Sequence, residues 1–150
     1  DTVQHIKIVH FFCNIIAKSI ERHAYNHDYS KLHNPEKKCF DIYTPKLADC
    51  TYGSEEYKRN LVEMQRALKH HYAENSHHPE HYENGIDGMD LVDVVEMLCD
   101  WKAATLRHKD GDIYKSLQIQ KERFGISDQL LNIMKNTVDR YLQGFDSNFR

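Results

Sequence analysis

Residues 55–74 read EEYKRNLVEMQRALKHHYAE, and the spacing of their apolar residues decides the fold class. From Tyr57 onwards these positions recur at alternating steps of four and three residues, and the last of them is a histidine, His71. Such spacing places side chains on one face of an α-helix. We therefore predict one helix over these residues, with His71 turned inwards and His70 turned away. The positions on this face are Tyr57, Leu61, Met64, Leu68 and His71.

The same periodicity continues on both sides of this stretch, and only three prolines and six glycines interrupt the chain. We expect helices over residues 3–22, 89–107 and 113–124, and another that begins after Ser127 as its N-cap. Residues 26–52 are more polar and predict a loop with one short helix near Pro35. The sequence thus predicts an all-α protein, a compact helical bundle. The first helix should bury a stripe made of Val9, Phe12, Ile16 and Ile20.

The composition indicates one domain over residues 1–150, since this length supports a single hydrophobic core. No apolar run approaches the roughly 18 residues of a membrane span. The net charge is -3, so the chain has no excess of basic residues of the kind that binds nucleic-acid phosphates. We expect neither a membrane nor a nucleic-acid polymer as a partner. The four cysteines form no C-x-x-C pair and follow no leader, so we expect a cytoplasmic protein. The oligomeric state stays open.

Histidine is the unusual component, with 11 residues, five of them between His70 and His81. They are internal and interleaved with other residue types, unlike a purification tag. Histidine at this density is typical of metal or proton chemistry.

Four parts of the chain offer metal-binding side chains: the first helix, the His27-Asp28 pair, the histidine-rich segment after residue 70, and the helix over residues 89–107. Imidazole nitrogen and carboxylate oxygen together suit Mn, Fe, Co, Ni or Zn better than Ca or Mg. Helix-bundle interiors commonly hold such metals. We therefore expect a divalent transition-metal site between the helices. Its expected ligands are His5, His27, Asp28, His71, His78 and Asp100.

Two of these choices have close competitors. His77 adjoins His78, and we expect His78 to be the ligand and His77 to face the substrate or support a ligand. Glu96 lies one turn before Asp100, and either carboxylate could bind metal while the other holds a ligand histidine. We favour Asp100. We assign His23 to the surface or to packing, and Asp93 to the solvated side of its helix.

The order His, His-Asp, further His and then Asp resembles the HD-domain superfamily of metal-dependent phosphohydrolases, over roughly residues 5–101. In that superfamily a lysine often follows the His-Asp pair, as Lys31 does here, and members with additional histidines hold two metal ions. The resemblance implies an HD-like bundle that holds two ions. The chain is also similar to an uncharacterised family of bacterial and viral proteins that share H-D-x-S-K, N-x-H-H-P-E-H and E-M-x-x-D-W.

The resemblance to the HD superfamily implies hydrolysis of a small phosphorylated substrate, such as a nucleotide. Asp28 and Lys31 are the expected catalytic residues, and Lys31, His77 and Arg22 are expected to bind substrate. Similar ligand sets occur in the superfamily's di-iron oxygenases, so oxygen chemistry is an alternative. A catalytically silent metal-binding or interaction protein is another.

Overall fold

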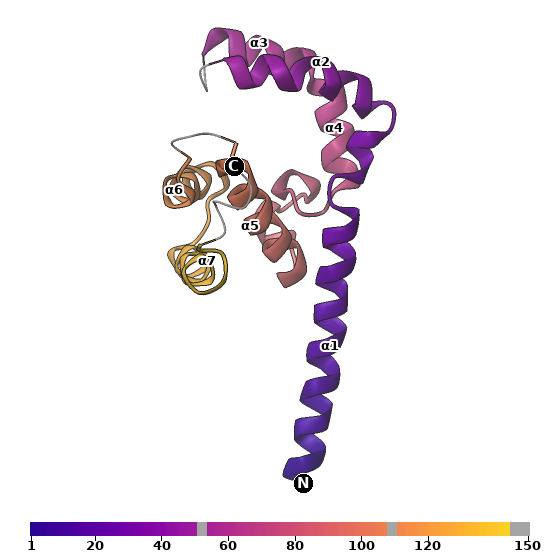
Figure 1. Ribbon diagram of the computed structural model, residues 1–150, viewed down its shortest axis with the longest axis vertical. Helices are drawn as coiled ribbons and strands as arrows, with labels where there is room; N and C mark the ends of the chain where they lie inside the picture. Colours follow the sequence, from indigo (N-terminus) through magenta and orange to yellow (C-terminus); the bar gives the residue numbers. More distant parts are fainter. Residues whose placement is uncertain (51–53, 108–110, 145–150) are drawn as a thin grey trace.

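The computed structural model describes residues 1–50, 54–107 and 111–144, and every regular element in these ranges is helical. The all-α prediction is therefore confirmed (Figure 1). The α-helices are α1 (Thr2–Asn26), α2 (Glu36–Asp49), α3 (Glu55–Glu63), α4 (Gln65–Glu74), α5 (Leu91–Thr105), α6 (Ile113–Phe124) and α7 (Asp128–Tyr141), and the short 3-10 helices are η1 (Tyr29–Leu32), η2 (Pro79–His81) and η3 (Gly85–Gly88).

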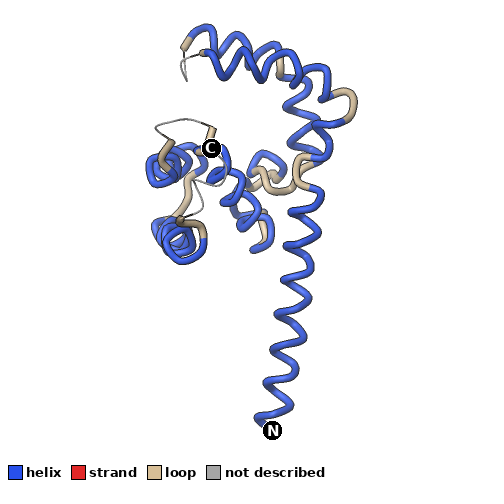
Figure 2. Tube along the Cα trace, in the orientation of Figure 1, coloured by secondary structure: helices blue, strands red, loops and turns tan. Residues whose placement is uncertain are grey.

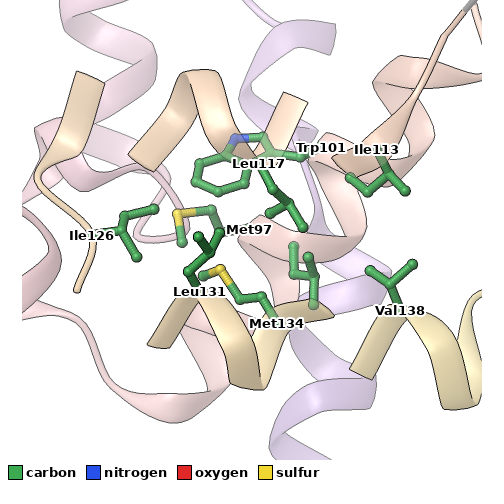
Figure 3. Packing of buried hydrophobic residues seen from close by; sticks show 9 residues of the cluster. Met97, Trp101, Ile113, Leu117, Ile126, Leu131, Met134 and Val138 are labelled. Carbon is green, nitrogen blue, oxygen red and sulfur yellow. The ribbon is translucent and has the colours of Figure 1, made fainter. Parts of the chain in front are cut away.

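The hydrophobic core lies between α5, α6 and α7 (Figure 3). Met97 and Trp101 project from one side of α5, four residues apart, and pack against side chains of the two following helices. Leu117 of α6 and Val138 of α7 have no solvent-exposed surface. Another side of α5 carries Glu96 and Asp100, and it faces the end of α1.

Helix α1 extends away from this core as a single long rod (Figures 1 and 2). Only its last turns lie beside α5, and residues 2–18 of the helix are exposed. The prediction of a buried stripe is therefore wrong for Val9, Phe12 and Ile16, which expose 44%, 59% and 49% of their surface. These side chains have the helical spacing we predicted, but no described part of the chain packs against them.

The helix predicted over residues 55–74 is divided in two at Met64. Met64 ends α3 and begins α4 with its side chain buried, so the chain bends at the middle of the predicted apolar face. Helix α3 then lies along α2, whereas α4 turns towards the end of α1 (Figure 1). The bend brings the C-terminal end of α4, with His71, to the centre of the molecule.

The polar segment after α1 contains more helix than predicted. The sequence predicts one short helix near Pro35, and α2 does begin there, but it runs for 14 residues and continues through Pro45. Before it, η1 follows directly on the His27-Asp28 pair. This segment contacts α4 through both η1 and α2.

None of the described helices has a stretch that is both apolar enough and long enough to traverse a lipid bilayer.

Candidate metal centre

Four elements meet at the side of α5 that faces the end of α1. The end of α1 supplies His23 and His27, the turn into η1 supplies Asp28, and α5 supplies Glu96 and Asp100. The end of α4 and the turn that follows it supply the remaining imidazoles, those of His71, His77 and His78. The fold therefore brings residues of the three sequence motifs together at one site.

Asp28 is the central residue of this cluster. Its backbone has a φ of 56°, in the left-handed region that non-glycine residues seldom adopt, and it joins the C-cap of α1, His27, to the start of η1. The carboxylate faces two ways. Its Oδ1 lies 3.2 Å from Nε2 of His71 and 3.6 Å from Nε2 of His77, and its Oδ2 lies 3.5 Å from Nε2 of His27.

The first group of candidate ligands comprises Asp28, His71, His77 and His78, whose nearest ligand atoms lie within 4.8 Å of one another. The Nε2 atoms of His71 and His78 are 2.9 Å apart. Two nitrogens that bind one ion at about 2.1 Å are separated by roughly 3–3.4 Å, so this pair is close to a ligating arrangement. One imidazole of the group, His77, is 2% exposed.

The second group comprises His27, Asp28 and Asp100. The Nε2 of His27 is 3.7 Å from the Asp100 carboxylate, and Asp28 belongs to both groups. The two groups thus share one carboxylate. This is the arrangement in which a carboxylate can bridge two metal ions.

Glu96 contacts imidazoles of both groups, and it also forms a further group of candidate ligands with His27 and His77. It accepts hydrogen bonds from Nδ1 of His27 and Nδ1 of His23, both at 2.8 Å, and lies 3.1 Å from Nδ1 of His77. An imidazole that donates from Nδ1 keeps the Nε2 lone pair available for a metal. Glu96 therefore fixes the tautomer and orientation in which His27 and His77 can act as ligands.

Glu36 has the same role for the first group from the opposite side. Its side chain is completely buried, and it accepts hydrogen bonds from Nδ1 of His71 at 2.9 Å and Nδ1 of His70 at 2.7 Å. The Ser30 hydroxyl also donates to it, at 3.0 Å, and the Asn75 amide donates to that hydroxyl at 2.8 Å. This buried chain of polar contacts locks His71 in place.

The electrostatics of the cluster follow from these contacts. The carboxylates of Asp100 and Glu96 raise the pKa of His27 to about 10. Burial raises the pKa of Asp28, but its contacts with His71 and with the Lys31 ammonium outweigh burial and hold that pKa well below its usual value. Burial lowers the pKa of His78 to about 3, with the help of the neighbouring imidazoles. The site therefore combines ionised carboxylates with a neutral imidazole.

Unsatisfied atoms show that these residues fit a metal. Among the described residues, three buried side-chain atoms lack a hydrogen-bond partner, and two of them are Oδ1 of Asp28 and Nε2 of His77. These two atoms face each other at 3.6 Å. A buried, unpaired carboxylate oxygen and imidazole nitrogen are costly unless a cation binds them.

The structure brings together five of the six predicted ligands and leaves one out. His27, Asp28, His71, His78 and Asp100 meet, whereas His5 lies exposed in the first turns of α1. Eighteen residues of one helix separate His5 from His23, a distance of about 27 Å. His5 is thus not part of this site within one chain. The helix that was predicted to turn it inwards is a straight rod.

The residues predicted to bind substrate lie close to the cluster. Lys31 contacts Oδ2 of Asp28 at 2.5 Å and lies over the ring of Phe40. Arg22 lines a cavity of about 200 Å³ together with His77 and Glu96. His77, expected to face the substrate, belongs instead to a group of candidate ligands.

Several supporting residues were missed or misassigned. His23 was assigned to the surface or to packing, but it contacts Glu96, and Asp93 was assigned to a solvated face, but it is 2% exposed. Glu36 carries no periodic signal, because it begins a helix after an irregular turn. Ser30 and Asn75 do stand inside the H-D-x-S-K and N-x-H-H-P-E-H motifs, which could have indicated their role.

Fold and site together define a class: an all-α protein in which histidine and carboxylate side chains from four elements form a cluster that could hold metal ions. The chain belongs to a family of unknown function, DUF5662, whose family model matches residues 1–140. Comparison with curated proteins and with solved structures yields no significant match.

Proposed function

We propose that this protein is a metal-dependent hydrolase that acts on a small phosphate ester, such as a nucleotide, at a site for two divalent transition-metal ions. The observation that carries the proposal is the sharing of Asp28 between two groups of candidate ligands. The mixture of imidazole and carboxylate favours Mn, Fe, Co, Ni or Zn.

The hydrogen bonds to Glu36 and Glu96 favour a metal-binding role for these imidazoles over a purely structural role. Three imidazoles, those of His27, His71 and His77, each have Nδ1 held by Glu36 or Glu96 and Nε2 directed towards Asp28 or Asp100. Structural zinc sites are usually closed by four protein ligands, often thiolates. Here the exposed Cys99 and Cys13 take no part in the ligand groups, and the cluster borders open cavities.

A small substrate suits the space beside the cluster. One cavity of about 200 Å³ is polar and is bordered by Arg22 and His77. A second, of about 270 Å³, lies between α1 and α5 and reaches His27 and Asp100. Pockets for small ligands have comparable or somewhat larger volumes.

Bound metal ions would supply Lewis-acid activation of a phosphate and a water of lowered pKa. Asp28, held in its left-handed conformation, keeps its two oxygens directed to the two ligand groups. Lys31 lies beside Asp28, where its ammonium can contact an oxygen of a bound phosphate. Arg22 can contribute a second positive charge from the end of α1.

The direct test measures phosphate release after removal of metal by a chelator and reconstitution with each of the five metals. The substrates are p-nitrophenyl phosphate and nucleoside monophosphates, and the variant is Asp28→Asn. Asp41→Asn is the matched control, because Asp41 is an exposed aspartate on α2 that pairs with Lys37 and belongs to none of the ligand groups of the described residues. We expect metal-dependent turnover in the wild type and the control, and a loss on the order of 10³-fold in Asp28→Asn.

Turnover that also occurs without oxygen would separate hydrolysis from the di-iron oxygenase alternative. Metal-dependent oxygen uptake without phosphate release would overturn the proposal in favour of the oxygenase. Stoichiometric metal binding with neither reaction would favour a non-catalytic metal-binding protein. Equal phosphate release by Asp28→Asn and the wild type would also contradict it.

A further inference from the structure

The cavity between α1 and α5 borders the candidate metal ligands but has largely apolar walls. Its volume is about 270 Å³, and its lining includes His27 and Asp100, which belong to the second group of candidate ligands. The proposed function uses these ligands and gives the apolar walls no role. We call this space the apolar cavity, and its six apolar lining residues are Ile20 and Ala24 of α1 and Val92, Val95, Cys99 and Ala103 of α5.

The apolar walls and the site residues share the same helix faces. On α1, His27 follows Ala24 by three positions, and on α5, Glu96 follows Val92 by four. Residues at these separations lie on one side of a helix. The two facing sides of α1 and α5 therefore carry both the site residues and the apolar walls. A molecule bound between His27 and Asp100 has apolar surface directly beside it.

The site has a polar side and an apolar side. His23 and Glu96 line both the apolar cavity and the smaller polar cavity, which also contains Arg22, Asn26 and Ser76. A phosphate ester has the same division, because a charged phosphate is joined through one oxygen to an alcohol portion. The two cavities thus match the two parts of such a molecule.

We propose that the apolar cavity binds the alcohol portion of the substrate, and that the substrate is a phosphate ester of an apolar alcohol. This inference rests on the proposed function, because it names the substrate class of the same site. The phosphate then lies at the ligand groups, with Arg22 on the polar side and the ester oxygen towards the apolar cavity. Hydrolysis adds water across the P–O bond and releases inorganic phosphate and the apolar alcohol.

The lining favours a hydrocarbon group over a nucleobase. The polar side chains of the apolar cavity contact one another, since Nδ1 of His23 and Nδ1 of His27 both donate to Glu96, and His27 lies 3.7 Å from Asp100. The edge of a nucleobase carries several donors and acceptors, and apolar walls would leave them unpaired. An apolar cavity of about 150 Å³ is large enough to bind benzene, so this one can hold a ring of that size or a short alkyl chain.

Alkylphosphonates test the apolar cavity without turnover, because their P–C bond is not an ester bond. The affinities of methyl-, ethyl-, propyl- and butylphosphonate for the zinc-reconstituted full chain are measured by isothermal titration calorimetry. We expect the Kd to fall about threefold for each added methylene group, because each is removed from water. The chain of 2-hydroxyethylphosphonate has nearly the size of a propyl chain but a polar end. We expect it to bind about tenfold more weakly than propylphosphonate.

Two substitutions in the walls test the location of the bound chain. Ala24→Phe narrows the apolar cavity from α1, and Val95→Thr places a hydroxyl in it from α5. We expect both variants to bind butylphosphonate about tenfold more weakly and methylphosphonate as the wild type does, which shows that the metal ligands are intact. Ala17→Phe is the matched control, because Ala17 is also an exposed alanine of α1 but does not line the apolar cavity.

The outcomes separate this inference from the proposed function. Affinities that stay the same along the alkyl series, or that the two wall substitutions leave unchanged, would overturn the inference. Affinity that rises with chain length, without phosphate release from butyl phosphate or any other ester, would support the apolar cavity and contradict the hydrolase. Phosphate release with equal kcat/KM from methyl and butyl phosphate would overturn the substrate class and support the hydrolase. A higher kcat/KM for a nucleoside monophosphate than for butyl phosphate would overturn the substrate class in favour of a nucleotide.

Discussion

Asp28 connects the backbone conformation to the chemistry of the site. A non-glycine residue in the left-handed region costs roughly 1–2 kcal/mol, although aspartate tolerates it better than most residues. The conformation lets two adjacent residues, His27 and Asp28, direct their side chains into the same cluster. The strain is therefore located at the residue that both ligand groups share.

Glu36 provides a test of the supporting carboxylates. Replacing it by glutamine keeps its volume but removes the charge that holds Nδ1 of His71 and His70. We expect Glu36→Gln to weaken metal binding by about 10–100-fold, as is typical for partners of ligand histidines. Affinity is measured by competition with a chromophoric chelator. Glu55→Gln, an exposed glutamate on α3, is the control, and equal affinities of the two variants would contradict this role.

The raised pKa of His27 predicts that metal binding expels a proton. Because that pKa is about 10, His27 is protonated in the metal-free protein at neutral pH, and ligation requires the neutral imidazole. His78 has a pKa of about 3 and has no proton to lose. Metal affinity should therefore rise by about tenfold per pH unit between about pH 6.5 and about pH 8.5. Chelator competition at several pH values measures this slope, and a flat profile would argue against His27 as a ligand.

The sequence predicts the site residues that stand in short motifs. It does not predict those whose place depends on how distant segments of the chain pack. His27, Asp28 and Asp100 were predicted as ligands, and they do meet. The choice of His78 over His77 could not be settled, because it depends on how the turn after α4 is folded. There the two imidazoles lie almost side by side, with ring centroids 4.1 Å apart, and both join the same group.

At the scale of elements, α5 is the helix on which core and site depend together. Asp90 and Asp93 form a capping box at its N-terminus. Asp93 also accepts hydrogen bonds from the hydroxyls of Ser76, at 2.6 Å, and Tyr82, at 2.7 Å. This buried carboxylate thereby ties the turn that contains His77 and His78 to the start of α5.

Removal of the Asp93 carboxylate tests this connection. Asp93→Ala leaves two hydroxyls and a backbone amide without their acceptor, so we expect the free energy of unfolding to fall by roughly 2–4 kcal/mol. Urea denaturation measures the change. Asp87→Ala, at an exposed aspartate in η3, should change stability by less than about 0.5 kcal/mol. A similar small effect of both substitutions would contradict the assigned role of Asp93.

The periodicity of the sequence predicts which elements are helical but not where a helix bends. Residues 113–124 were predicted as a helix and form α6, and Ser127 caps α7 as expected. The apolar face that begins at Tyr57 continues across Met64 without a break, although the helix does not. Helices α3 and α4 both pack against α2 on either side of the bend, and no local residue signals it.

At the scale of the whole molecule, the cluster connects the packed pair α1 and α5 to η1 and α4, which contact each other. Metal should therefore stabilise the fold as well as fill the site. At a free metal concentration of about 100 times the dissociation constant, the expected gain is about 2.7 kcal/mol. Thermal unfolding with and without a chelator measures it. The gain should be lost in Asp28→Asn, which removes the carboxylate that both groups share, and kept in Asp41→Asn, and an equal gain in both variants would indicate non-specific binding.

The all-α class follows from periodicity, but the placement of α1 does not. The apolar spacing around Phe12 and Ile16 is the same whether a helix is buried within its own chain or against another one. This is the physical reason that the predicted burial was wrong and that His5 was assigned to the site. A straight helix cannot bring both of its ends to one cluster.

The central claim is that one carboxylate, that of Asp28, joins two metal positions. Anomalous X-ray diffraction from crystals reconstituted with manganese or zinc tests it most directly. We expect two anomalous peaks, one on either side of Asp28, the first contacted by His71, His77 and His78 and the second by His27 and Asp100. A peak elsewhere, or a fully reconstituted crystal in which Asp28 contacts no ion, would contradict it.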